Sequence, residues 1–163
     1  MIMSDNTIEA RLSAAHAAAE AAGALVGRIA RSLYDACAVD GRLSGAALDA
    51  RQVISLELAE AAAQVEATRQ VLAWAAEVRR RGKGITTDGG ILLEERIALY
   101  YAATATRDLL ARVRLREADF GLTAEDVDGT AGAPGILAFV TAEASTAQVE
   151  ALGAVVRDMN GNT

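Results

Sequence analysis

Cysteine, histidine, proline and tryptophan each occur once in this chain, and aromatic residues make up only 4% of it. The single cysteine, Cys37, cannot form an intramolecular disulfide or a thiolate cluster for zinc, so we predict that it packs in the core. The single histidine, His16, excludes Ser/His/Asp and Cys/His catalytic groups and the Glu-x-x-His pairs of ferritin-like di-iron bundles. We predict that His16 lies half-buried at the edge of a helical bundle.

Positive charge is also scarce. The chain has 16 Lys and Arg against 22 Asp and Glu, and its net charge of −6 opposes binding to nucleic acid or an anionic membrane surface. The N-terminus has no basic segment followed by an apolar one, and the longest uncharged run, residues 129–142, is too short to span a bilayer. We therefore expect a cytoplasmic protein with no nucleic-acid or membrane partner, folded as a single domain over residues 1–163.

Alanine, in contrast, fills roughly a quarter of the chain. It loses no side-chain entropy in a helix and lets neighbouring helices approach closely, which favours a helical bundle over a sheet. Apolar residues recur at spacings of three and four from Ile8 to Leu115 and predict three long helices. The first, expected over residues 6–39, would be a rod of about 50 Å.

The second helix is predicted from its N-cap, Ser44, to Arg81, with Gly82 in the left-handed terminating conformation. Its apolar residues form two stripes, which indicate burial on two sides and hence a homo- or hetero-oligomer. One stripe comprises Ile54, Leu58, Ala61, Val65, Leu72 and Ala75. The other comprises Val53, Leu56, Ala63, Ala67, Val71, Trp74 and Val78.

The remaining segments complete an antiparallel four-helix bundle of three long helices and one shorter C-terminal helix. Residues 82–90 are expected to be an interhelical loop, with Asp88 capping a third helix over residues 90–120. The acidic, glycine-rich residues 123–135 are expected to be mobile, and residues 136–140 are either a short helix or extended. A final helix should follow Ser145, whose spacing to Gln148 is that of a capping box.

Polar and aromatic groups on these helices leave alternatives open. Four carboxylates are interpreted as a solvated face: Glu57, Glu60, Glu94 and Glu95. The cations at residues 79–83 either complement the carbonyl end of the second helix or hold a phosphate. Trp74, Tyr100 and Tyr101 are core or interface residues, or alternatively stack on a flavin or nucleotide ring.

Several local sequences match motifs of one enzyme family. Asp40-Gly41-Arg42-Leu43 stands where that family has a Phe-Gly-x-Pro-Leu turn, and Gln52 follows near the start of the next helix. An alanine-rich Glu-Ala-x-Arg stretch lies at residues 66–69, and Asp119-Phe120-Gly121-Leu122 is similar to a glycine–aromatic turn after the third helix. Ala142-Glu143-Ala144-Ser145 occupies the position of a Tyr-Glu-Gly-Thr loop. In these features the chain resembles the C-terminal helical domain of the flavin-dependent acyl-CoA dehydrogenases.

The resemblance implies that Glu143 is the catalytic base, and that Ser145, Gln52 and Arg42 contact the FAD cofactor. In that family an N-terminal helical domain and a central β-domain form much of the flavin and acyl-CoA sites. The resemblance therefore implies a stand-alone subunit that completes an FAD/acyl-CoA site with a partner chain. The alternative is a non-catalytic, oligomeric helical bundle with an interaction or structural role.

Overall fold

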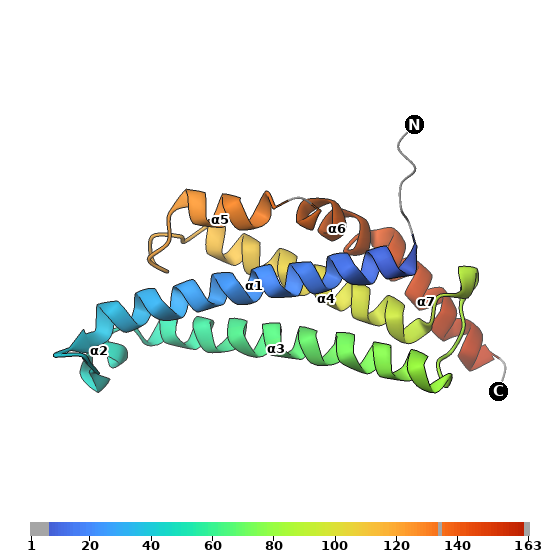
Figure 1. Ribbon diagram of the computed structural model, residues 1–163, viewed down its shortest axis with the longest axis horizontal. Helices are drawn as coiled ribbons and strands as arrows, with labels where there is room; N and C mark the ends of the chain where they lie inside the picture. The colour runs from blue at the N-terminus through green and yellow to red at the C-terminus, as the bar shows by residue number, and fades with distance from the viewer. Residues whose placement is uncertain (1–6, 134, 162–163) are drawn as a thin grey trace.

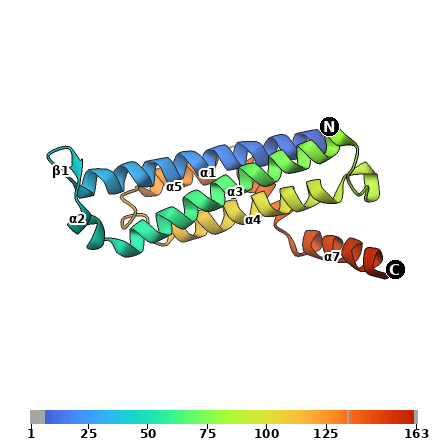
Figure 2. The ribbon, with the colours of Figure 1, turned by 90° about the horizontal axis from the view of Figure 1, so that it is seen from below.

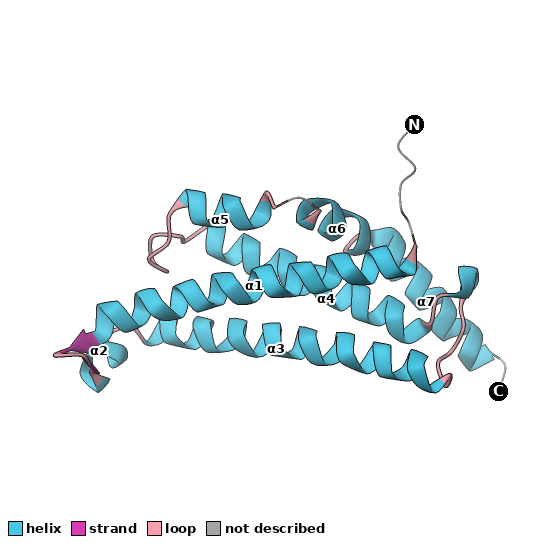
Figure 3. Cartoon of the chain, viewed as in Figure 1, coloured by secondary structure: helices cyan, strands magenta, loops and turns pink. Residues whose placement is uncertain are grey.

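The computed structural model describes residues 7–133 and 135–161, and within these ranges the chain is mostly helical, which confirms the predicted all-α class. Figure 1 shows three long helices lying side by side, and Figure 3 shows a small β-hairpin at one end. The helices are α1 (Ile8–Cys37), α2 (Gly45–Asp49), α3 (Gln52–Arg81), α4 (Leu93–Arg114), α5 (Ala124–Ala131), α6 (Ile136–Glu143) and α7 (Thr146–Gly161). The hairpin pairs β1 (Ala38–Val39) with β2 (Arg42–Leu43) in antiparallel register.

The connection between α1 and α3 is more structured than predicted. Helix α1 ends at Cys37 because the next two residues enter the hairpin, whose turn places Asp40 and Gly41 at positive φ. The Ser44 hydroxyl accepts from the N–H of Ala47 and caps the short helix α2, as an N-cap should. The predicted second helix is thus interrupted, because Arg51 leaves the helical conformation (φ −124°, ψ 31°) before α3 begins.

The end of α3 agrees with the sequence prediction, whereas the start of α4 differs. Gly82 takes the left-handed conformation, with φ of 63°. Asp88 does not cap α4: it begins a 3₁₀ turn (Asp88–Gly90), and Leu92 occupies the N-cap position of α4. The carboxylate of Glu95 accepts from the Leu92 N–H over 2.9 Å, so a side chain inside the helix satisfies its first turn.

The glycine-rich, acidic region that was expected to be mobile contains a helix, α5. Thr123 and Asp126 form a reciprocal capping box at its start. Helix α6 resolves the undecided residues 136–140 in favour of a helix. The predicted helix after Ser145 is α7, but the Ser145 hydroxyl donates to the carbonyl of Ala142, and the N–H of Gln148 donates to the Ser145 backbone carbonyl.

Helices α1, α3 and α4 pack against one another, and the α5–α6 pair covers the groove between α1 and α4. Helix α7 packs on α4 and diverges from the other helices in Figure 2. Helices α5 and α6 therefore occupy the position beside α1 and α4. The sequence had suggested a mobile segment at α5 and had left the conformation of the residues in α6 undecided. In the described part of the chain, no helix is both long and apolar enough to cross a membrane.

The core consists of two clusters along the helix axes. One surrounds Leu25, Ile29 and Phe120 near the hairpin end, and the other surrounds Leu72 and Leu99 among small alanines. Cys37 is 1% exposed, which confirms its predicted packing role. His16 is exposed, so the prediction of a half-buried histidine was wrong. Alanine side chains in the second cluster let α1, α3 and α4 lie close together.

Candidate functional site

Glu143, the predicted base, lies buried at the C-terminal end of α6. The buried side chains of this helix are Ile136, Phe139 and Glu143, whose spacings of three and four place them on one face. That face packs against α1 and α4, so the Glu143 carboxylate is buried together with the apolar residues of the same face. Only 6% of the Glu143 side chain is exposed.

Arg11 of α1 meets this carboxylate in a two-pronged ion pair. Its Nε donates to Oε1 over 2.7 Å and its Nη2 donates to Oε2 over 2.8 Å. The hydrogen bonds from Arg11 to Glu143 raise the pKa of the guanidinium above its ordinary value and outweigh the opposing effect of its burial. The bidentate geometry therefore fixes α6 on α1.

The ion pair borders a shallow hollow between α1 and α6 with a volume of about 290 Å³. Its other lining residues are small or apolar: Ala10, Ala14, Gly135, Ala138, Phe139 and Ala142. A carboxylate beside an apolar hollow can remove a weakly acidic proton once the carboxylate is released from its ion-pair partner. In the observed arrangement, Arg11 would have to move for Glu143 to act in this way.

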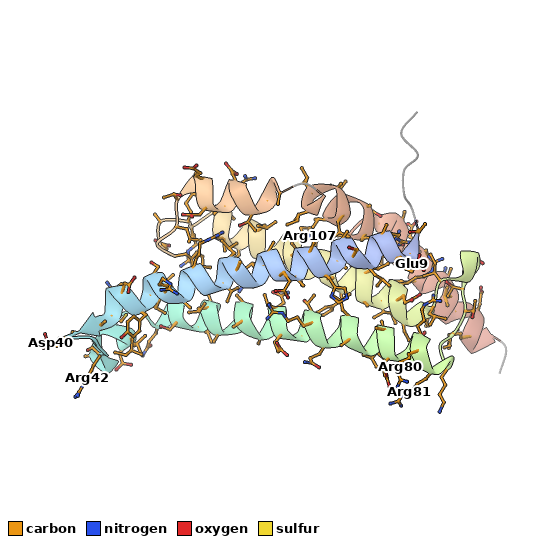
Figure 4. The ribbon with its side chains drawn as sticks, in the orientation of Figure 1. Glu9, Asp40, Arg42, Arg80, Arg81 and Arg107 are labelled. Carbon is orange, nitrogen blue, oxygen red and sulfur yellow. The ribbon has the colours of Figure 1, made fainter. Side chains whose placement is uncertain are left out.

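Two of the predicted cofactor contacts, Arg42 and Gln52, lie at the opposite end of the molecule. Arg42 is exposed in β2, and Figure 4 shows it beside Asp40 at the hairpin end, far from Glu9 at the start of α1. Gln52 is the first residue of α3 and lines a cleft of about 460 Å³ together with Arg51, Arg116 and Asp119, among others. This cleft is a polar site in which two guanidinium groups and two carboxylates, Asp49 and Asp119, lie close together.

The four predicted site residues therefore form two groups rather than one site within the chain. Ser145 follows Glu143 by two residues, so these two share one end. Arg11 and Cys37, the residue just before the hairpin, are separated by 26 helical positions, or about 40 Å at ~1.5 Å per residue. A ligand that touched both groups would have to lie between two molecules.

A second buried carboxylate, Glu95, corrects the prediction of a solvated face. Its side chain is 0% exposed and forms a bidentate pair with Arg79 of α3. Burial acts to raise the pKa of Glu95, but the hydrogen bonds from Arg79 and from the Leu92 N–H outweigh it and lower the pKa. Two of the other carboxylates on α3 also form ion pairs: Glu57 with Arg116 in the turn after α4, and Glu60 with Arg112 of α4.

The remaining candidate residues fall into separate environments. The cations at the end of α3 divide between partners, because Arg79 binds Glu95 whereas Arg80 and Arg81 pair with Glu77 on the surface. Trp74 is 47% exposed and lies outside the core. Within the described residues, no group of three or more His, Cys, Asp or Glu side chains is arranged to hold a metal ion.

Comparison with known proteins identifies no relative: no family model, characterised protein or solved structure matches the chain significantly.

Proposed function

We propose that this chain is a cytoplasmic subunit similar to the C-terminal domain of acyl-CoA dehydrogenases, completing an FAD/acyl-CoA site with a partner chain. The observation that carries the proposal is the buried Glu143, which borders an apolar hollow and lies two residues before Ser145, just ahead of the closing helix α7. In this proposal the domain corresponds to an antiparallel four-helix bundle in which α1, α3 and α4 are the long members and α7, which packs on α4, is the shorter C-terminal helix. Helices α5 and α6 are then additions that cover α1 and α4.

The separation of the predicted site residues supports dependence on a second molecule. Arg42 in β2 and Gln52 at the start of α3 occupy the hairpin end of the bundle. The end of α6 that carries Glu143, and Ser145 after it, lie toward the other end. Neither end forms a closed cradle for a ring system as large as a flavin, because the cleft beside Gln52 and the hollow beside Glu143 are both open. A partner chain would supply the remaining walls of the site.

In such a complex Glu143 would remove a proton from the carbon next to the thioester carbonyl. The bound FAD would supply the hydride acceptor for the β-carbon, so that a carbon–carbon double bond forms as the two C–H bonds break. Before this step, Arg11 would have to release the carboxylate, since both carboxylate oxygens accept hydrogen bonds from the guanidinium. Closure of the hollow by a partner would exclude water and make Glu143 a stronger base.

A non-catalytic helical bundle is the second candidate, and the Arg11–Glu143 pair is the observation that favours it. The pair satisfies both side chains and joins α6 to α1, which is a sufficient structural reason for a buried glutamate. In that case the chain would be an oligomeric interaction or structural protein without flavin.

Activity measurements on the natively purified complex distinguish the two candidates. If the complex carries flavin and oxidises an acyl-CoA, Glu143→Gln should slow the chemical step by roughly 10²-fold or more, with bound flavin retained. Glu150→Gln, at an exposed position of α7, is the matched control. An active complex that is indifferent to Glu143→Gln would place the base on the partner chain, and a colourless, inactive assembly would favour the structural role.

A further inference from the structure

Helix α3 presents an apolar face to solvent. The face consists of Val53, Leu56, Ala63, Ala67, Val71, Trp74 and Val78, here called the outer stripe of α3. Ala67, Val71 and Val78 are half-buried, and Glu60, which pairs with Arg112 of α4, interrupts the stripe. Val53 and Leu56 are each 62% exposed, and Trp74 is 47% exposed. In the view of Figure 2, α3 and α4 lie side by side, and no other described element lies over α3.

Helix α4 extends this apolar surface. On α4, Ile97 is 39% exposed and Tyr101 is half-buried, and Leu115, the residue that follows the helix, is 84% exposed. Strips about 10 Å wide along α3 and α4 would together offer about 800 Å² per molecule, given lengths of ~45 and ~33 Å. That area matches one side of a standard protein–protein interface, so the surface is large enough for a specific partner.

The outer stripe is self-complementary in its order of large and small residues. Leu56 and Trp74 both lie nine residues from Val65, on either side of it, and Ala63 and Ala67 both lie two residues from it. If a second α3 runs antiparallel across the level of Val65, each Trp74 meets a Leu56, and the alanines meet at the centre. Small central side chains permit close approach of the two helices, and the large pairs fill the space on either side.

Charge at the helix ends supports the same alignment. In the antiparallel arrangement the basic residues 79–81 of the two copies lie at opposite ends of the interface. The arrangement also places the N-terminal end of one α3 dipole beside the C-terminal end of the other. A parallel arrangement would instead put the basic residues 79–83 of both copies together.

We propose that two copies of this chain pair through the outer stripe of α3, antiparallel and two-fold symmetric about the level of Val65. The pairing brings the Gln52 end of one copy to the same end of the assembly as Glu143 of the other. It does not depend on flavin, so a colourless dimer would support the pairing while counting against the proposed enzymatic role. A flavin-containing assembly with a single copy of this chain would support the enzymatic role and contradict the pairing.

The first test is the oligomeric state of the full chain. Light scattering after gel filtration should give twice the chain mass at micromolar concentration, and emission from Trp74, the only tryptophan, should shift to the blue as the dimer forms. Trp74→Glu should raise the dimer dissociation constant at least tenfold, while Ala62→Glu, an exposed position outside the stripe, should leave it unchanged. A monomer at these concentrations, or equal effects of the two variants, would overturn the proposal.

The second test measures the direction of the pairing by disulfide formation, with Cys37→Ala as the background. Val53→Cys and Val78→Cys should cross-link when the two variants are mixed, because these residues lie twelve and thirteen residues from Val65 and so face each other to within one residue between antiparallel copies. Each variant alone should stay unlinked, since its two thiols would be separated by about 37 Å, far beyond disulfide reach. Self-linking of each variant without mixed linking would show parallel pairing, and no linking at all would equally contradict the proposed interface.

Discussion

Two arginine–glutamate pairs with buried carboxylates hold together helices that are distant in sequence. Arg11 and Glu143 join α1 to α6, and Arg79 and Glu95 join α3 to α4. Glutamates this deep are rare unless a cation and further hydrogen bonds compensate for the lost hydration. Each pair is therefore expected to matter most when one of its partners is removed.

The Arg79–Glu95 pair predicts acid-sensitive stability. The pKa of Glu95 is lowered from its ordinary value of 4.5, so the carboxylate stabilises the fold above that pH and loses its contribution as pH falls through its folded value. Urea denaturation across a pH series should show a smaller acid-induced loss of unfolding free energy in Glu95→Gln than in wild type. Part of the acid-induced loss of unfolding free energy should remain in Glu95→Gln, because hydrogen bonds from Thr123 also lower the pKa of Asp126.

The exposed Glu125→Gln serves as the control for this series and should leave the pH profile of stability unchanged. A Glu95→Gln profile that is superimposable on wild type would show that the pair does not govern acid stability.

The Arg11–Glu143 pair predicts strong coupling between its two residues. Either Arg11→Met or Glu143→Met alone should cost about 1–3 kcal/mol of unfolding free energy, because each leaves a buried charge without its partner. The double variant should recover much of that loss, since two apolar side chains can pack together. Thermal or urea denaturation of all four proteins gives the coupling energy, and purely additive effects would contradict the structural importance of the pair.

The pattern of the sequence could have revealed one inward-facing charge of each pair. Arg11 precedes Ala15 by four and Ala18 by seven, and Glu95 precedes Leu99 by four. Both charges thus continue an apolar stripe and face inward, a position that requires a partner. The partners themselves were not predictable, because residues 132 and 16 positions away meet only after the helices pack.

At the scale of elements, two glycine turns differ in their packing. The turn at Gly121, after α4, lies against α1, whereas the hairpin turn leaves open space beside Gly41. Gly121 (φ 66°) and Gly41 (φ 73°) share a left-handed conformation, but a Cβ on Gly121 would lie 1.7 Å from Ser32 Oγ, whereas a Cβ on Gly41 would meet open space. Both positions disfavour other residues by their backbone conformation, and only Gly121 adds a steric conflict.

We therefore expect Gly121→Ala to destabilise the protein by about 2–4 kcal/mol, from the conformational cost plus overpacking, and Gly41→Ala by only about 1 kcal/mol. The difference between their urea midpoints isolates the contact with Ser32. Equal losses for the two variants would show that Ser32 simply rotates away.

The elements that sequence reasoning identified well are the long ones. Periodicity over α1, α3 and α4 recovered three helices, and Gly82 marked the end of α3. Helix α5 was missed because glycine and acidic composition suggested a loop, although Thr123 and Asp126 already formed the signature of a capping box. Tertiary contacts also support α5, since the Arg28 guanidinium of α1 donates to Thr130 over 2.8 Å.

At the scale of the whole molecule, surfaces left open by the fold point to assembly. The outer stripe of α3 is exposed, and α7 has no buried residue among its described side chains. Two separated groups of predicted site residues likewise require a second molecule if they serve one ligand. The sequence predicted an oligomer from the two stripes of α3, but it could not predict which end of the bundle each site residue would occupy.

Native mass spectrometry of the protein purified from its own cells, combined with a flavin absorption scan, tests the central claim most directly. We predict an assembly that contains this chain, a larger partner chain and non-covalently bound FAD, with the flavin spectrum lost when the partner is removed. A stable assembly of this chain alone, without flavin or partner, would contradict the proposed acyl-CoA dehydrogenase-like role.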